Sequence, residues 1–259
     1  MAKITKLTQG RLKVTSSLRY TTDKDMKNKD IQKISNHTEI NKFLEKVATM
    51  PIANRSNDRG RLIFALDATA SRAATWDMAA HIQADMFQTV AQLGGLDIQL
   101  VYYHGYQQFN STAWIANSQQ LLNVMNQVQC LAGITQITKV LKHSLSETKQ
   151  KKVQALVFIG DCIEESPELL YQLAGQLAIF NVPVFMFQEG DDLLTTQVFQ
   201  KIASITKGAY CHFDQGSAEQ LKEILEAVAS YVAGGKKALQ QYSKTRGALS
   251  QKITRQLLR

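Results

Sequence analysis

The sequence of 259 residues predicts a doubly wound α/β fold, in which helices cover both faces of a mostly parallel sheet that has one antiparallel edge strand. Short, continuous apolar runs recur between residues 61 and 232, as expected of strands that are covered on both faces. Segments with helical spacing separate these runs, which is the βαβ order of a parallel sheet. Helix stop and start signals, Gly94-Gly95 and Ser166-Pro167, separate the segments from their neighbours.

The alternation of strands and helices begins at residue 61. Residues 62–66 are an unbroken apolar run and form the first strand, followed by a helix over 75–93. Residues 96–103 form the second strand. After a turn at Gly105, residues 107–115 alternate in polarity, which favours a short third strand at the antiparallel edge.

The second half repeats the alternation. Two helical segments, 118–128 and 137–145, lead to a buried strand at 153–159. The next helix has a clear beginning, because Ser166 suits the N-cap and Pro167 the first helical position. The remaining expected elements are a strand at 182–187, a helix at 193–204, a strand at 209–213 and a helix at 217–232 that opens with a capping box.

Net charge divides the chain into three parts. The formal charge is +8, but residues 1–60 hold 13 Lys and Arg against 6 Asp and Glu, and residues 233–259 hold 7 basic residues and no acidic one. Residues 61–232 hold 10 basic and 16 acidic residues. We expect a basic N-terminal arm over 1–60 with a short helix near 39–50, one domain over 61–232, and a basic C-terminal tail over 233–259 with helical spacing. Such ends suit an acidic partner, a nucleic acid or a membrane surface, and equally suit solvent.

Cysteine and hydropathy patterns argue against several classes of protein. The three cysteines form no CxxC pair, so a disulfide framework and a four-ligand zinc site are not expected. No apolar run approaches the roughly 18 residues that span a bilayer. Without a secretory apolar segment, the expected location is the cytoplasm. Neither G-x-G-x-x-G nor G-x-x-x-x-G-K-[ST] follows the first strand, which argues against a dinucleotide site or a phosphate-cradling loop.

Oxygen-bearing side chains follow two buried strands and precede one helix. Asp67, Thr69 and Ser71 come after the first strand, Asp161 comes after the strand at 153–159, and Thr135 precedes a helix. In doubly wound sheets ligands bind at the carboxyl ends of the strands. Two carboxylates and three hydroxyls suit a hard cation, Mg²⁺ or Mn²⁺, in an octahedral shell of oxygens.

The pattern Asp-x-Thr-x-Ser, with a Thr before a later helix and an Asp after the next buried strand, resembles the von Willebrand factor type A (VWA) domain and its metal-ion-dependent adhesion site. The resemblance covers residues 61–232 and implies a Rossmann-like doubly wound fold. Within the family, the sequence most resembles bacterial cytoplasmic members. The resemblance implies that Thr69, Ser71 and Thr135 bind the metal directly and that Asp67 and Asp161 act mainly through water. Ser is more usual at position 69, and Thr-Asp-Gly is more usual at 160–162.

The resemblance also implies a function without catalysis. In the family a partner protein's carboxylate fills the open position of the metal. Two aspartates roughly balance the charge of a divalent cation without making the site strongly negative, so the cation can still attract that carboxylate. The alternatives are nucleic-acid or anionic-surface binding through the basic ends, and a phosphoester hydrolase. The hydrolase is disfavoured because its Asp-x-Asp pattern is broken by Thr69.

Several residues near the expected site have two interpretations. Glu164 and Glu165 either form an acidic rim that selects a cationic partner or precede a helix start, where carboxylates are favourable. Residues 102–106 either offer an aromatic rim or end a strand. Cys130 and Cys162 are expected to be buried, unreactive thiols rather than a redox switch.

Overall fold

The computed structural model describes residues 42–43, 45–47, 59–73, 96–213, 223 and 225–234. The chain divides into two units, 1–37 and 38–259, and every described residue belongs to the second. The expected helix at 75–93, the capping box at 217–220, and most of the basic arm and tail lie outside the described residues.

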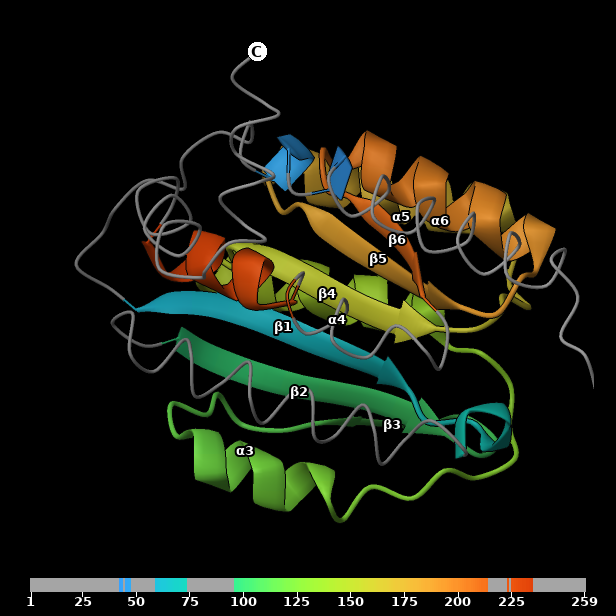
Figure 1. Ribbon diagram of the computed structural model, residues 1–259, viewed down its shortest axis with the longest axis horizontal. Helices are drawn as coiled ribbons and strands as arrows, with labels where there is room; N and C mark the ends of the chain where they lie inside the picture. Colours follow the sequence, from blue (N-terminus) through green and yellow to red (C-terminus); the bar gives the residue numbers. More distant parts are fainter. Residues whose placement is uncertain are drawn as a thin grey trace, which may run out of the picture. The chain divides into compact units, whose positions relative to one another are not determined.

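A six-stranded sheet with the order β3-β2-β1-β4-β5-β6 forms the centre of the second unit (Figure 1). Every neighbouring pair is parallel except β2 and β3, which are antiparallel. The strands are β1 (Gly60–Asp67), β2 (Leu96–His104), β3 (Gln108–Ser111), β4 (Ala155–Gly160), β5 (Val184–Glu189) and β6 (Tyr210–Phe213). The expected doubly wound α/β fold with one antiparallel edge strand is confirmed.

The described helices lie where the sequence predicted helical segments: α3 (Ser118–Met125), α4 (Ile137–Gln150), α5 (Pro167–Ile179), α6 (Leu193–Ile205) and the helical residues 225–234. The 3₁₀ turn η1 (Ala70–Arg72), which follows β1, was not predicted. The edge strand β3 is shorter than expected, and Ile115 pairs with Ile98 only as an isolated bridge. Ser166 is the N-cap of α5, but its hydroxyl donates to Glu168 at 2.7 Å and does not cap the helix backbone.

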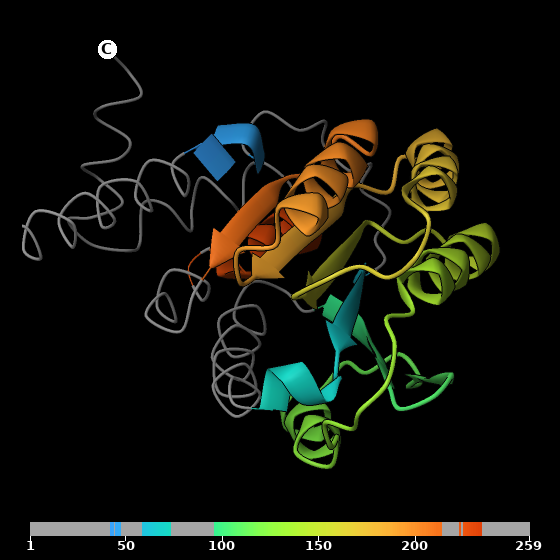
Figure 2. The ribbon, with the colours of Figure 1, turned by 90° about the vertical axis from the view of Figure 1, so that its right-hand side faces the viewer.

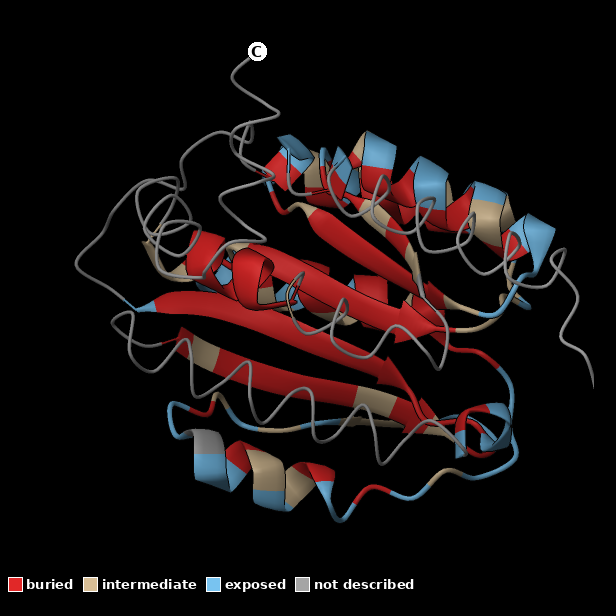
Figure 3. Ribbon diagram, viewed as in Figure 1, coloured by how far each residue is buried: buried red, intermediate tan, exposed pale blue. Residues whose placement is uncertain are grey.

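Alternating strand side chains build two separate cores, one on each face of the sheet. One core joins Ile63, Ala65 and their neighbours to the buried faces of α4, α5 and α6. The other joins Leu62 and Phe64 to α3, to the helical residues 225–232 and to residues 43 and 47. Figure 3 shows the central strands buried along most of their length. Burial on both faces explains why these strands read as continuous apolar runs.

The strand order reverses between β1 and β4, because β2 lies on one side of this pair and β5 on the other. Leu66 pairs with Ile159, so both strands end at the same level. The carboxyl ends of β1 and β4 therefore form the switch point where doubly wound sheets bind ligands. Figure 2 views this end of the sheet, which we call the carboxyl edge.

Candidate metal site

Asp67, the last residue of β1, is fully buried at the switch point. Its Oδ1 accepts a hydrogen bond from the backbone N–H of Thr69 at 2.8 Å, and its Oδ2 accepts one from the Tyr103 hydroxyl at 3.0 Å. Tyr103 is itself buried in β2, beside Phe158. The carboxylate is therefore held in one orientation by the chain that follows it and by the neighbouring strand.

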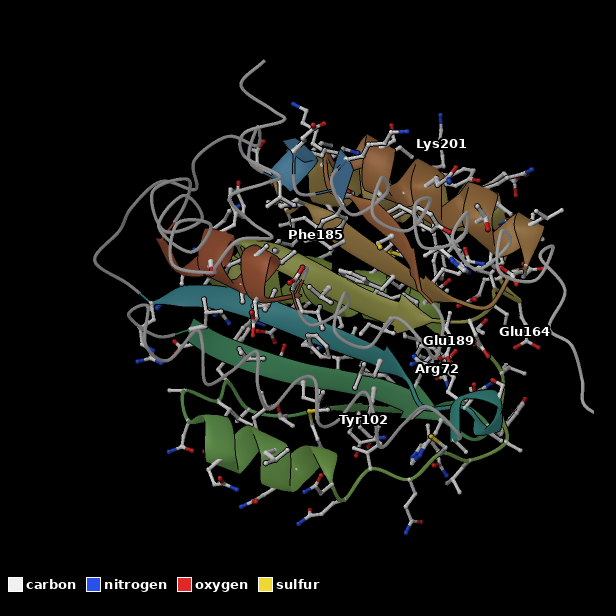
Figure 4. The ribbon with its side chains drawn as sticks, in the orientation of Figure 1. Arg72, Tyr102, Glu164, Phe185, Glu189 and Lys201 are labelled. Carbon is white, nitrogen blue, oxygen red and sulfur yellow. The ribbon has the colours of Figure 1, made fainter. Side chains whose placement is uncertain are left out.

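The turn after β1 brings two hydroxyls together. The Thr69 and Ser71 side-chain oxygens are 3.1 Å apart; Thr69 is buried and Ser71 is exposed. In the same turn, buried Arg72 donates from Nε to Glu189 at the end of β5, at 2.9 Å. Figure 4 shows Arg72 and Glu189 close together at the carboxyl edge, with Glu164 nearby. This ion pair ties η1 to the sheet, and so holds the turn that carries both hydroxyls.

Asp161 follows β4 and carries an oxygen without a hydrogen bond. Within the described part of the chain, Asp161 Oδ1 is buried and has no hydrogen-bond partner. Buried polar oxygens are normally paired, and an unpaired one marks a place for an ion or a water. Burial, together with the negative charge of Asp161 and a hydrogen bond to it, raises the pKa of the neighbouring Cys162 thiol to about 12. Cys162 therefore stays protonated, as expected of an unreactive thiol, although Cys130 and Cys162 are only partly buried and not fully buried as predicted.

Thr135 lies in the loop before α4 and is held by the loop after β4. Its hydroxyl donates to Glu165 Oε2 at 2.5 Å and accepts from the Glu164 backbone N–H at 2.9 Å. The Glu164 carboxylate in turn accepts from the Thr135 N–H at 2.7 Å. Glu165 Oε1 also accepts from the N–H of Thr138, in the first turn of α4. Glu164 and Glu165 thus bind the Thr135 loop, a role that neither sequence interpretation included.

Electrostatics at the switch point is dominated by buried negative charge. Burial raises the pKa of Asp67, hydrogen bonds from Thr69 oppose this shift, and the nearby charge of Asp161 adds to it. Burial also raises the pKa of Tyr103 well above its ordinary value, with further contributions from Asp67 and Glu165. The site therefore favours anything that neutralises carboxylates, either protons or a cation.

The structure brings the five predicted residues to the same edge in two groups. Asp67, Thr69 and Ser71 converge through direct hydrogen bonds, and Asp161 lies close enough for its charge to act on Asp67. Thr135 is linked to Asp161 by its hydrogen bonds with Glu164 and Glu165, which lie in the loop that Asp161 begins. The bridge between Leu131 and Thr69 places the beginning of the Thr135 loop against the first group.

Sequence reasoning missed four residues that support this edge. They are Tyr103, Arg72, Glu189 and, as a partner of Thr135, Glu165. Tyr103 and Glu165 had local signals, because Tyr103 belongs to the aromatic run 102–106 and Glu165 follows Asp161 by four positions, but their hydrogen bonds were not predicted. Arg72 and Glu189 pair across 117 positions of sequence, and no local pattern marks such a pair.

The donor atoms fit a hard divalent cation. Among the described residues, no group of three or more His, Cys, Asp and Glu side chains could hold a metal, so a soft or carboxylate-only site is not indicated there. The unpaired Oδ1 of Asp161 and the hydroxyls of Thr69 and Ser71 are oxygen ligands of the kind that Mg²⁺ accepts, usually with waters. Thr135 donates its only proton to Glu165 and accepts one bond, which leaves one lone pair for a cation.

No protein-family model matches this sequence, and no curated protein is similar enough in sequence to serve as a relative. Solved structures do share its fold. Proximal thread matrix protein 1 from the mussel byssus, solved with a zinc-occupied MIDAS motif, matches 66% of this chain and 46% of its own with a TM-score of 0.54 and 14% identity. The von Willebrand factor type A structure from Catenulispora acidiphila matches 68% and 43%, with a TM-score of 0.53 and 15% identity.

A third similar structure is the pilus adhesin SpaC from Lactobacillus rhamnosus GG, matched over 74% of this chain and 31% of its own, with a TM-score of 0.54 and 11% identity. This chain thus spans less than half the length of each of the three. The predicted VWA-like fold is confirmed. In the described part of the chain, no helix has the length and apolar character needed to cross a membrane.

Proposed function

We propose that this chain is a divalent-metal-dependent protein-interaction module, which binds Mg²⁺ or Mn²⁺ at the carboxyl edge and thereby captures an Asp or Glu carboxylate of a partner protein. The observation that carries the proposal is the buried Asp161 Oδ1, which has no hydrogen-bond partner among the described residues. An unpaired buried carboxylate oxygen costs free energy, and a bound cation removes that cost.

The five predicted residues would have two roles in binding the cation. Thr69, Ser71 and Thr135 would offer hydroxyl oxygens, and Asp67 and Asp161 would supply the negative charge. When bound, the cation supplies a positive centre that attracts a carboxylate. Tyr103 and the Thr69 N–H hold Asp67 in place, so the buried charge is oriented before the cation arrives.

The geometry favours binding over hydrolysis. A nucleophilic aspartate must present an oxygen to its substrate. Asp67 is fully buried, and both of its oxygens accept hydrogen bonds. An electrostatic role behind the site suits this carboxylate better than attack on a phosphoester. Binding of a nucleic acid or an anionic surface by residues 1–60 and 233–259 stays a prediction, since most of those residues lie outside the described ones.

Calorimetric titration with Mg²⁺ and with Mn²⁺ tests the proposal. We expect wild-type protein freed of metal to bind at least one ion, and Asp67→Ala and Asp161→Asn to lose about tenfold or more in affinity. Asp161→Asn is nearly the same shape as the native residue, so it still tests the proposal if Asp67→Ala fails to fold. Asp97→Asn is the matched control, because Asp97 lies in β2 far from its carboxyl end and pairs with Arg59 at 2.7 Å. Wild-type protein that binds neither ion would contradict the proposal.

A further inference from the structure

Exposed large apolar side chains gather at the carboxyl edge. Of the eight such residues in the described part of the chain, six follow the strand ends or begin the helices there: Tyr106, Leu131, Ile134, Leu169, Leu193 and Leu194. The other two, Ile179 and Phe180, lie at the end of α5 near the opposite edge. Scattered apolar residues on a surface need no explanation, whereas a collection on one edge indicates a binding surface.

Three of these residues lie on the loops beside the candidate metal site, and we call Tyr106, Leu131 and Ile134 the apolar rim. Leu131 pairs with Thr69, and its N–H donates to Ala68 at 3.1 Å. Ile134 immediately precedes Thr135. Tyr106 is 77% exposed, Leu131 41% and Ile134 43%.

The apolar rim has a rigid base. The Gly105 N–H donates to the Leu131 carbonyl, and a Cβ on Gly133 would lie 2.0 Å from the Gly105 carbonyl oxygen. The turn that carries Tyr106 and the loop that carries Leu131 and Ile134 are therefore in backbone contact. Side chains on such a base can bind a partner without first ordering the loops.

Carboxylates border the site on the side of β4 and β5, and we call Glu164, Glu168, Asp191 and Asp192 the acidic rim. All four side chains are exposed. A hydrogen bond from Ser166 lowers the pKa of Glu168, and bonds from Thr195 lower that of Asp192, so both are ionised at neutral pH. They stand beyond the ends of β4 and β5, whereas Tyr106 follows β2 on the other side of the switch point.

This asymmetry identifies the chemistry of the partner. We propose that the carboxyl edge docks a protein segment in which one Asp or Glu is flanked on one side by large aliphatic residues and on the other by Lys or Arg. The inference rests on the proposed function, since the carboxylate needs the cation. The aliphatic side chains pack on the apolar rim, and the basic residues lie against the acidic rim. A nucleic acid fits poorly, because four exposed carboxylates would repel its phosphates.

Fluorescence anisotropy with defined peptides tests the proposal. The parent peptide carries Leu-Ile before a central Glu and Lys-Lys after it. Three variants replace Glu with Gln, Leu-Ile with Ser-Ser, or Lys-Lys with Ser-Ser. With Mn²⁺ we expect the parent to bind about tenfold tighter than each variant, the gain from one well-made contact, and to be released by EDTA.

Protein variants identify the surface. Leu131→Ser combined with Ile134→Ser should abolish the preference for Leu-Ile. Glu168→Gln combined with Asp191→Asn should abolish the preference for Lys-Lys, because neither residue holds the Thr135 loop. Ile179→Ser is the matched control, because Ile179 is 79% exposed near the opposite edge. Calorimetry with Mn²⁺ on wild type and on every variant separates this inference from the proposed function. Wild-type protein that does not bind Mn²⁺ contradicts the proposed function. Intact ion binding, with peptides that bind equally whatever their flanks or do not bind at all, overturns this inference alone.

Discussion

Buried charges are fully paired at the amino ends of the strands, which we call the amino edge, and incompletely paired at the carboxyl edge. At the amino edge, the nearly buried Arg61 donates to the Lys151 carbonyl at 2.5 Å and to Glu147 at 3.1 Å, and its guanidinium lies 3.7 Å from the centre of the Trp114 ring. Trp114 donates to the same Glu147 carboxylate at 2.9 Å. Each charge in this network has a protein partner, so the network serves the fold.

The carboxyl edge leaves negative charge without full compensation. Burial raises the pKa of Asp67, and the nearby negative charge of Asp161 raises it further. Asp161 Oδ1 has no hydrogen-bond partner among the described residues. Arg72 contributes positive charge but pairs with Glu189. Stability alone does not select such an arrangement. The edge with incomplete pairing is therefore the edge at which we propose ion binding, and four changes test this contrast.

The largest effect is expected at the amino edge. Arg61→Ala leaves Glu147 largely buried without its cation and removes the contact with Trp114. We expect a loss of about 3 kcal/mol in the free energy of unfolding, as for other broken buried ion pairs, and no change in affinity for Mn²⁺. Urea denaturation and calorimetry measure the two quantities. A variant that loses ion affinity while folded would show that the edges are coupled.

Gly133→Ala should disturb the carboxyl edge through its backbone. A Cβ there would overlap the Gly105 carbonyl, so the loop before α4 must move away from the turn after β2. We expect about 2 kcal/mol of destabilisation, typical of an overpacked site, together with weaker Mn²⁺ binding, because Thr135 lies in the same loop. Gly175→Ala is the control, since nothing lies near its added Cβ. Equal stability of the two variants in urea would contradict the close contact.

Glu165→Gln should weaken ion binding with little effect on folding. The Thr135 hydroxyl donates to Glu165 at 2.5 Å, and a charged acceptor makes that hydroxyl oxygen a better ligand than a neutral amide would. We expect about tenfold lower affinity for Mn²⁺, the usual cost of losing a residue that orients a ligand. Glu168→Gln is the control, because Glu168 is exposed and bonded to Ser166. If both variants bind Mn²⁺ like wild type, Glu165 does not act through Thr135.

The smallest effect concerns His143, which lies away from the candidate site in α4. Its Nε2 is 2.8 Å from Gln99 Oε1, and burial lowers its pKa, with Glu147 opposing. The unfolded chain therefore binds the proton more tightly, so stability is lost as pH falls through the ordinary histidine pKa of about 6.5. His143→Gln should reduce this loss in urea denaturation at pH 7.5 and 5.5. An unchanged pH dependence would assign it to other groups.

Local patterns predicted most of the fold. The continuous apolar runs of β1 and β4 reflect burial on both faces, and the alternation over β3 reflects an edge. Helix ends were predicted less well: α4 extends to Gln150, beyond the apolar spacing that ends at Leu145. The N-cap position of Ser166 was right, but its hydroxyl bonds Glu168, because two polar side chains within reach compete with the backbone.

The sequence by itself determined the strand order along the chain, the positions that follow each strand, and hence which oxygen-bearing residues share the carboxyl edge. Those properties depend on near neighbours in the chain and on the alternation of apolar residues. Only the tertiary structure decided which of these oxygens are already bonded: Tyr103 on Asp67, Glu165 on Thr135, and no described residue on Asp161 Oδ1. Hydrogen bonds act over about 3 Å between segments far apart in the chain, and such pairings exist only once the sheet has closed.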